Sequence, residues 1–407
     1  MARIREKLST HLISKRPGGR WPRHNVCMSE VVLHLAEADS AHDALWRKIG
    51  VGRIVRDKAE EDSLGRLIRD GTWPGIRRPA NRTGFAAEVA SASNEPWVDA
   101  NGYLVEYWRS LDPGRPVWLA PAPPEREDVK FADHSLELAL IEARLAGGNC
   151  VLRLPKAFSA RLFAGESGAA AAWTRLGETV RWLRQQQSLF GLEPMPNITA
   201  LVEPGLPTRE IANLLHRRGA SPYLQAAARA LPTGHKAEAL VGAGVKVLPP
   251  SVIEAVRSGA MLVWDQPAPT GAELSRQDSD RNFYTLGQGR VVSYTRRIAD
   301  PSEFALDVID LITHKRRAAR IWNASSVIAA ATRGPVAGEA ILRLVNYGAQ
   351  AREDVQAHVF GHYARALLLR PGQAPEPLKT ARRGASTEVF LPVLERVAIV
   401  RFSNRGD

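Results

Sequence analysis

Glu106 is the residue of this 407-residue chain that best fits acid–base chemistry. It lies in the run 103–108, whose aromatic and β-branched residues predict a short buried strand. Burial among aromatic rings raises the pKa of a carboxyl group and suits it to proton transfer. Asp99, in the turn before this run, is a candidate for a second carboxyl group. Two simpler alternatives stay open, because Glu106 can pair with Arg109 and an aspartate in such a turn commonly closes an Asx turn.

The spacing of cysteines, histidines and glycines argues against metal or cofactor chemistry. Cys27 and Cys150 are far apart, which predicts free thiols and gives no metal-ligand spacing. His34 and His42 are eight residues apart, whereas a zinc-binding helix places two histidines four apart. The sequence at 287–289 has too few glycines for a dinucleotide site. We therefore expect no metal and no cofactor.

The chain is basic, with a formal net charge of +12 and a pI near 10.0. A nucleic acid or another polyanion is the partner that such a charge suggests. The arginines are spread along the chain, however, and no helix-turn-helix, zinc finger or RNP-like strand accompanies them, so nucleic acid is not the expected partner.

Two features of the sequence bear on membranes and export. No uninterrupted apolar run reaches the roughly 18 residues of a membrane-spanning helix, so no membrane partner is expected. The basic segment 1–20 lacks the apolar stretch of about 7–15 residues that a secretory signal needs. Localisation is cytoplasmic by default, and it stays open because the start of the chain could be wrongly assigned.

Short apolar strands and amphipathic helices alternate in the first half of the chain, which is typical of a parallel sheet or barrel. The segment between 71 and 95 is rich in glycine, proline, asparagine and arginine and is expected to be an irregular loop. The predicted helices are 29–49, 57–69, 135–147 and 168–187, and the predicted strands are 103–108, 117–119 and 150–154.

A second α/β unit begins near residue 196. Its clearest signal is 300–303, where an aspartate, a proline and a glutamate precede an apolar run and predict the start of a helix. Beyond residue 314 the pattern changes to period two with frequent turns, which predicts an antiparallel β-sandwich. The expected elements of the second unit are strands 198–202, 261–264 and 291–294 and helix 208–218. Those of the sandwich are strands 326–331, 339–346, 354–360, 363–369, 387–391 and 397–402.

This order of parts resembles the glycoside hydrolases of the beta-galactosidase type, which carry an amidotransferase-like middle domain. The stretch 101–107 is similar to a late strand of their barrel, and 138–154 to a helix and strand of the same barrel. The stretches 286–292 and 343–347 resemble strands of their middle domain and terminal sandwich. The resemblance implies an α/β fold with a basic tail (1–20), a partial or complete TIM-like barrel segment (21–192), an amidotransferase-like, flavodoxin-like domain (193–316) and a β-sandwich (317–407).

The resemblance implies a carbohydrate ligand. Glycosidic bonds are normally cleaved by two flanking carboxyl groups, for which Glu106 and Asp99 are the candidates. Flat aromatic rings suit stacking on sugar faces, although Trp46, Trp173 and Trp182 lie on helix stripes and are expected in the core. The candidate substrate-binding residues are His24, Asn25, Trp73, Trp97, Asn101, Trp108 and Arg109.

One departure from the resemblance matters for function. A complete eight-unit barrel needs about 200–250 residues, more than the segment 21–192 supplies. Two functions follow: a glycoside hydrolase with paired carboxylates, or a non-catalytic carbohydrate-binding or scaffold protein derived from one. The segment 151–407 contains no cysteine, which excludes an amidotransferase nucleophile there. The resemblance also implies a homo-oligomer formed through the middle domain.

Overall fold

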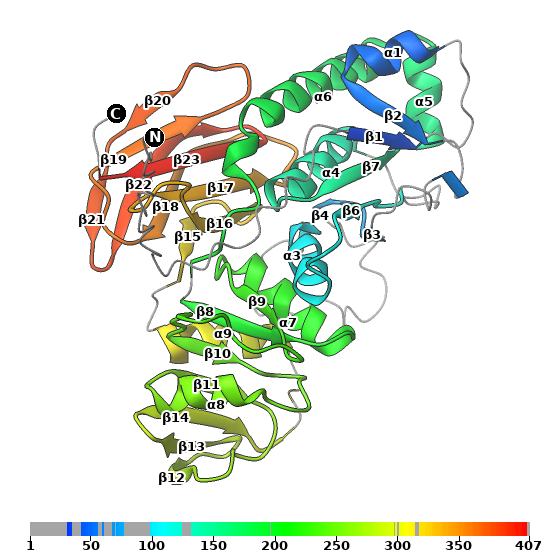
Figure 1. Cartoon of the computed structure of the whole chain (residues 1–407). Coiled ribbons are helices and arrows are strands. Elements are labelled where there is room, and N and C mark those ends of the chain that lie inside the picture. The colour runs from blue at the N-terminus through cyan, green and yellow to red at the C-terminus, as the bar shows by residue number, and fades with distance from the viewer. Residues whose placement is uncertain are drawn as a thin grey trace, which may run out of the picture.

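The computed structural model describes residues 31–34, 42–55, 59–60, 67–69, 71–76, 98–123, 132–195, 197–296, 298, 301–313 and 317–404. These residues form three units of mixed α/β and β structure that meet at one junction (Figure 1). Within these ranges, no helix combines the length and the apolar character needed to cross a bilayer.

The first unit is built on a five-stranded sheet in which every pair is parallel. The first strand along the chain pairs with the last, as in a closed barrel, but the described residues contain no pairing between the edge strands β2 and β3. In spatial order the strands are β2 (Val51–Val55), β1 (Val31–His34), β7 (Asn149–Arg153), β6 (Val117–Leu119) and β3 (Leu67–Arg69). A separate pair joins β4 (Gly75–Ile76) to β5 (Val98–Asp99).

Helices cover this sheet and bury the aromatic residues expected in the core. Trp46 and Trp173 pack edge to face with ring centroids 5.4 Å apart, and Trp182 is also buried. Cys150, in β7, is a buried free thiol, as predicted, whereas Cys27 lies outside the described residues. The helices are α1 (Asp43–Lys48), α3 (Gly102–Leu111), α4 (His134–Leu145), α5 (Lys156–Phe163), α6 (Ser167–Gln185) and a 3-10 turn (Gln187–Leu189).

Three sequence predictions in this unit are wrong. The run 103–108 is not a strand but the middle of α3. Its apolar residues Leu104, Tyr107 and Leu111 recur at helical spacing, so the tertiary environment overrides the strand propensity of its aromatic residues. The predicted helix 29–49 divides into β1 and α1, and the predicted helix 57–69 ends in β3. Short parallel strands appear in the sequence as continuous apolar runs, and periodicity alone does not distinguish such runs from buried helix segments.

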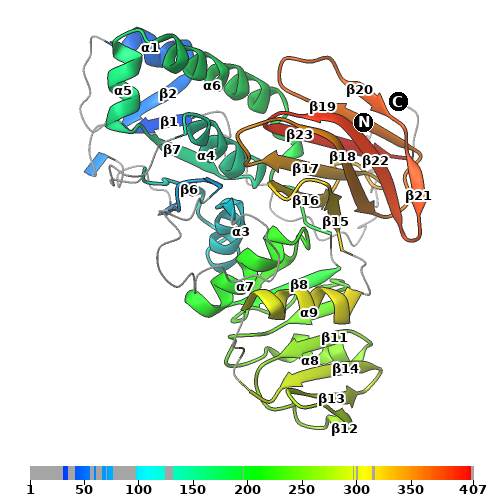
Figure 2. The same cartoon turned by 180° about the vertical axis from the view of Figure 1, so that it is seen from behind.

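The middle unit is a seven-stranded sheet with helices on both faces. Five strands are parallel, and β12 and β13 extend one edge in antiparallel fashion. Alternate residues of the strands pack under α7 and α9 on one face and under α8 on the other (Figure 2). In spatial order the strands are β12 (Glu273–Gln277), β13 (Arg281–Leu286), β14 (Gly289–Tyr294), β11 (Met261–Trp264), β10 (Ala239–Val241), β8 (Ile198–Val202) and β9 (Tyr223–Ala226). The helices are α7 (Leu206–Arg217), α8 (Pro250–Arg257) and α9 (Pro301–Thr313).

The glycine pair at 287–289 has a structural role in this sheet. Gly287 and Gln288 form the two-residue turn between β13 and β14, and Gly287 has a φ of +61°, which glycine adopts readily. A side chain at Gly289 would clash with the carbonyl oxygen of Val256 in α8. These glycines therefore fit a tight turn and a close helix contact.

The C-terminal unit consists of two antiparallel sheets that share one core. The odd and even residues of β17 separate its two faces: Leu342 and Leu344 contact the partner sheet, whereas Ile341 and Val345 pack against the first unit. The four-stranded sheet contains β15 (Ala319–Trp322), β18 (Arg352–Phe360), β22 (Ser386–Leu394) and β21 (Ala381–Arg383). The five-stranded sheet contains β16 (Val327–Arg333), β17 (Ala340–Asn346), β23 (Val397–Ser403), β19 (Arg365–Leu369) and β20 (Glu376–Leu378).

Candidate functional site

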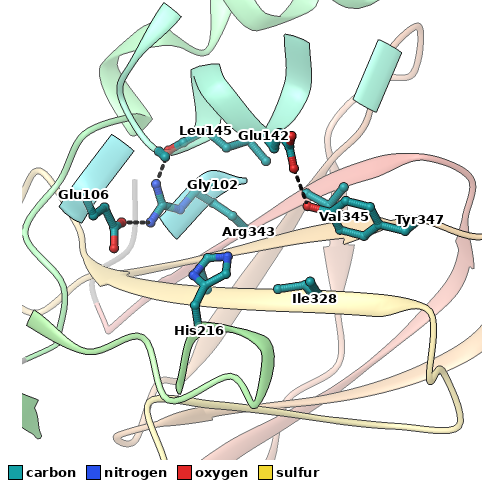
Figure 3. Close-up of a pocket in the computed structure, with 11 residues that line it drawn as sticks. Gly102, Glu106, Glu142, Leu145, His216, Ile328, Arg343, Val345 and Tyr347 are labelled. Atoms are coloured by element: carbon teal, nitrogen blue, oxygen red, sulfur yellow. Dashed lines mark hydrogen bonds and ion pairs between the residues drawn. The ribbon is translucent and has the colours of Figure 1, made fainter. Parts of the chain in front are cut away.

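The three units line a small cavity where they meet (Figure 3). Helices α3 and α4 contribute from the first unit, α7 from the middle unit, and β16 and β17 from the C-terminal unit. Its volume is about 30 Å³, which corresponds to a few water molecules at roughly 10–15 Å³ each on the same measure. The polar residues that line it are Glu106, Glu142, His216, Arg343 and Tyr347.

Glu106 faces two arginines at the C-terminal end of α4. Arg343 lies 3.9 Å from the Glu106 carboxylate and donates a hydrogen bond to the carbonyl oxygen of Leu145. Arg109 donates to the carbonyl oxygen of Ala146 at 3.0 Å. The last carbonyl groups of a helix have no partner within it and carry partial negative charge. The two arginines therefore complete the end of α4, and Glu106 balances their charge.

Burial dominates the electrostatics of this group of charges. It raises the pKa of Glu106, while the neighbouring Arg343 and Arg109 act in the opposite direction. It lowers the pKa of both arginines. The Glu106 side chain is only 16% exposed. A carboxylate in this position depends on its cationic neighbours to remain charged.

Glu142, in the last turn of α4, is the second carboxyl group in the cavity. It accepts hydrogen bonds from the main-chain N–H of Asn101 at 2.8 Å and from the Tyr347 hydroxyl at 3.0 Å, and a third from the Asn101 side chain. Burial raises the pKa of Glu142 to about 7, although these hydrogen bonds oppose the shift. Glu142 therefore holds its proton up to near-neutral pH, unlike an ordinary glutamate.

His216 brings the middle unit to the cavity. It projects from α7 toward Arg343 (Figure 3). Burial, together with the positive charges of Arg343 and Arg217, lowers its pKa to about 4. The imidazole is therefore neutral at neutral pH, so it adds no third positive charge beside Glu106.

The structure brings together some of the residues predicted from sequence. Glu106 lines the cavity, but from a helix and not from a strand. Asp99 lies in β5 and is absent from the cavity wall; its charge contributes to the raised pKa of Glu142. Asn101 is buried, and its side chain bonds both Glu142 and Thr72. Arg109 completes the end of α4.

The aromatic candidates lie elsewhere. Trp73 and Trp108 are partly buried and pack against the core of the first unit. Trp108 also contacts the core of the middle unit. His24, Asn25 and Trp97 lie outside the described residues.

Sequence reasoning missed four cavity residues: Glu142, His216, Arg343 and Tyr347. One sequence feature pointed to Glu142, which is an acidic residue within the apolar sequence of α4. A carboxylate is rarely buried without partners, so such a residue indicates a polar site. Arg343 and Tyr347 belong to the stretch 343–347, which resembled a sandwich strand. Their relation to the first unit depends on contacts between distant parts of the chain.

No protein-family model and no curated protein sequence matches the chain. Among solved structures, the alpha-L-fucosidase isoenzyme 2 from Paenibacillus thiaminolyticus has a similar fold, with 10% identity and a TM-score of 0.50 over 75% of this chain. The chain spans 63% of the length of that fucosidase chain. At this identity the likeness shows the fold alone, which is glycoside-hydrolase-like.

Two further structures are similar at lower scores. The beta-galactosidase from Rahnella sp. R3 is 12% identical, with a TM-score of 0.45 over 74% of this chain and 57% of that chain. The rhamnosidase from Novosphingobium sp. PP1Y is 15% identical, with a TM-score of 0.44 over 72% of this chain and 31% of that chain.

Proposed function

We propose that the protein is a glycoside hydrolase that acts on a carbohydrate. The observation that carries the proposal is that two carboxyl groups, the partly buried Glu106 and the buried Glu142, line one cavity in a chain with a glycoside-hydrolase-like fold. Glycosidic cleavage uses such a pair, one carboxyl group protonated and the other ionised. Glu142 replaces Asp99 as the proposed partner of Glu106.

The surroundings of the two carboxyl groups suggest which of them acts as the general acid and which as the base or nucleophile. Glu142, with a pKa of about 7 and only uncharged hydrogen-bond donors, is the proposed general acid. Glu106, beside Arg343 and Arg109, is the proposed base or nucleophile, because the two guanidinium groups favour its charged form. Pairs of carboxyl groups with different environments take such separate roles in catalysis.

The finer architecture supports the same proposal. The five parallel strands of the middle unit follow the spatial order β9-β8-β10-β11-β14, which is the flavodoxin-like order 2-1-3-4-5 along the chain. The first sheet has the circular order of a barrel, and within the described residues β2 and β3 are its edges. We propose that the chain combines a partial barrel, a flavodoxin-like domain and a β-sandwich.

The size of the cavity favours a second candidate function. At about 30 Å³ it is smaller than a sugar ring, so cleavage there requires the junction to open. The second candidate is a non-catalytic carbohydrate-binding or scaffold protein, in which Glu106 and Glu142 hold the three units together. The two candidates differ in what the two carboxyl groups do.

Hydrolysis of aryl glycosides tests the two candidates. The panel includes α-L-fucosides, β-galactosides and rhamnosides, and the variants are Glu106→Gln and Glu142→Gln. The matched control is Glu178→Gln, at an exposed position on α6. For a hydrolase, each cavity variant loses about 10²–10⁴-fold in rate while the control keeps the wild-type rate. Absence of turnover by the folded wild-type protein supports the non-catalytic candidate, whereas equal rates in all variants would remove Glu106 and Glu142 from the mechanism.

A further inference from the structure

We propose that the outer face of the four-stranded sheet β15-β18-β22-β21 is a saccharide-binding surface, separate from the junction cavity. The proposal shares its ligand class with the proposed function, but it does not require that Glu106 or Glu142 cleave a bond. The surface, called here the outer platform, consists of Arg320, Trp322, Gln356, His358, Arg383, Glu388 and Phe390.

The strand register places these residues on one face. Arg320 pairs with His358 and Trp322 with Gln356, and across the next strand pair His358 meets Glu388 and Gln356 meets Phe390. The intervening residues of β18 and β22, which include Val355, Val359, Val389 and Leu391, are buried in the core between the two sheets. Because side chains alternate along a strand, the platform residues point away from that core.

The position of the sheet leaves this face on the far side of the molecule from the junction. The five-stranded sheet packs against the first unit through Ile341 and Val345 and against the four-stranded sheet through its other face. Figures 1 and 2 show β18, β21 and β22 on the side of the C-terminal unit away from α4. A ligand on the outer platform would not contact the cavity residues.

Glu388 organises the polar part of the platform. The Nε2 atom of His358 lies 2.7 Å from one carboxylate oxygen, to which Gln356 also donates, and Arg383 donates to the other oxygen at 3.1 Å. Only 3% of Glu388 is exposed, and its neighbours cover it. Burial by itself raises the pKa of Glu388, but the hydrogen bonds from His358, Gln356 and Arg383 hold it below the ordinary value.

The hydrogen bonds to Glu388 hold the side chains of Gln356 and Arg383 in place, and both side chains have further polar atoms that can bind a ligand. In the hydrogen bonds of the described residues, Gln356 uses its amide nitrogen toward Glu388, so its carbonyl oxygen remains an acceptor. Arg383 uses its Nε atom, so its terminal nitrogens remain donors. Polar groups held in place by a buried partner lose little freedom on binding a ligand.

Aromatic rings lie beside these polar groups. Phe390 is 53% exposed and is directly opposite Gln356 in the sheet. The ring of Trp322 lies under the guanidinium group of Arg320 at 4.2 Å and contacts the His358 ring, with centroids 4.1 Å apart. Phe390 therefore offers an open ring face, while Trp322 is a second ring two strands away, with Gln356 between them.

A saccharide matches this combination of groups. A sugar ring has an apolar face of C–H groups that packs on an aromatic ring, and a rim of hydroxyl groups that both donate and accept hydrogen bonds. Phe390 suits the apolar face, and Gln356 and Arg383 suit the hydroxyl rim. A protein partner would be expected to bury a larger apolar area, whereas Phe390 is the only exposed large apolar residue of this sheet within the described residues.

Affinity electrophoresis in gels that contain galactan, xylan, cellulose derivatives or polygalacturonate tests the proposal. We expect at least one polysaccharide to retard the wild-type protein. Phe390→Ala should weaken that binding about tenfold, the size expected for loss of an aromatic contact, and Gln356→Ala should also weaken it. Leu274→Ala, which removes an exposed apolar residue from the middle unit, is the matched control and should bind as the wild type does.

Each outcome bears on one proposal only. Failure of every polysaccharide to retard the wild-type protein overturns the outer platform, as does retardation that Phe390→Ala leaves unchanged. Aryl-glycoside hydrolysis should be insensitive to Phe390→Ala, and gel binding should be insensitive to Glu142→Gln. Loss of cleavage with intact gel binding would therefore concern the junction cavity alone.

Discussion

The junction cavity and the outer platform each contain a buried glutamate, and the pKa values of the two are shifted in opposite directions. Glu142 and Glu388 are both 3% exposed, yet the pKa of Glu142 is raised to about 7 and that of Glu388 is lowered. Glu142 receives its hydrogen bonds from an asparagine and a tyrosine, whereas Glu388 receives two of its own from an arginine and a histidine. Burial dominates at Glu142, whose donors are uncharged, whereas at Glu388 the hydrogen bonds, including one from the Arg383 guanidinium, outweigh the effect of burial.

Arg343→Ala should produce the largest change in the junction. It leaves Glu106 without its closest cationic partner and removes a donor from the end of α4. Breaking a buried ion pair in this way costs about 3–5 kcal/mol. The free energy of unfolding in urea measures the effect, with Arg365→Ala, an exposed position of β19, as the control. A loss no larger than that of the control would show that the arginine does not hold the junction.

The free energy of unfolding should depend on pH through the ionisation of Glu142. Its pKa is raised from 4.5 to about 7, so the folded state binds this proton more tightly than the unfolded state does. The resulting stabilisation is fully present below pH 4.5 and is lost as the pH rises through about 7. Over that interval it amounts to about 3 kcal/mol at 1.36 kcal/mol per pH unit.

Unfolding measured from pH 4.5 to pH 8 for the wild type and Glu142→Gln tests this expectation. Glutamine resembles the protonated acid and cannot ionise, so the variant should lack the fall in stability that Glu142 causes. Parallel curves for the two proteins would contradict the raised pKa. Glu178→Gln, which replaces an exposed acid, should follow the wild type.

Glu388→Gln should show the opposite pH dependence. The pKa of Glu388 is lowered in the folded state, so its stabilising effect is present above the unfolded value of 4.5 and is lost as the pH falls below it. The variant should be less stable than the wild type by roughly 2 kcal/mol at pH 7, because hydrogen bonds to a charged group are lost. The difference should shrink toward pH 3, and a constant difference would mean that charge is not the cause.

Phe390→Ala should have the smallest effect on stability. The ring is 53% exposed, and substitutions at such surface positions usually change the free energy of unfolding by about 0.5 kcal/mol or less. Urea unfolding of the variant should therefore overlay the wild-type curve. A clear loss of stability would mean that the ring contributes to the sheet and is a poor probe of ligand binding.

The elements predicted correctly from sequence share a strong local signal. Helix α9 begins at Pro301, as its capping residues predict, and α6 has the expected buried stripe. Strands β6, β8 and β11 have the predicted bounds. Helix caps, periodic apolar stripes and short apolar runs carry this information within a short stretch of chain.

The junction cavity could not be predicted in the same way. Glu106 was chosen because of a strand that is in fact a helix. The partners of Glu142 are Asn101 and Tyr347, which are 41 and 205 residues away in the sequence. No local pattern connects residues at such distances, and the three-dimensional arrangement of the units is needed to bring them together.

The bond from Arg343 to the carbonyl oxygen of Leu145 spans 198 residues. On a ribosome that adds about 5–20 residues per second, roughly 10–40 s separate the synthesis of its two ends. During that interval Glu106 and the end of α4 have Arg109 as a cationic neighbour but not Arg343. We therefore expect the first unit to be less stable, and more easily degraded, before β17 is made than afterwards.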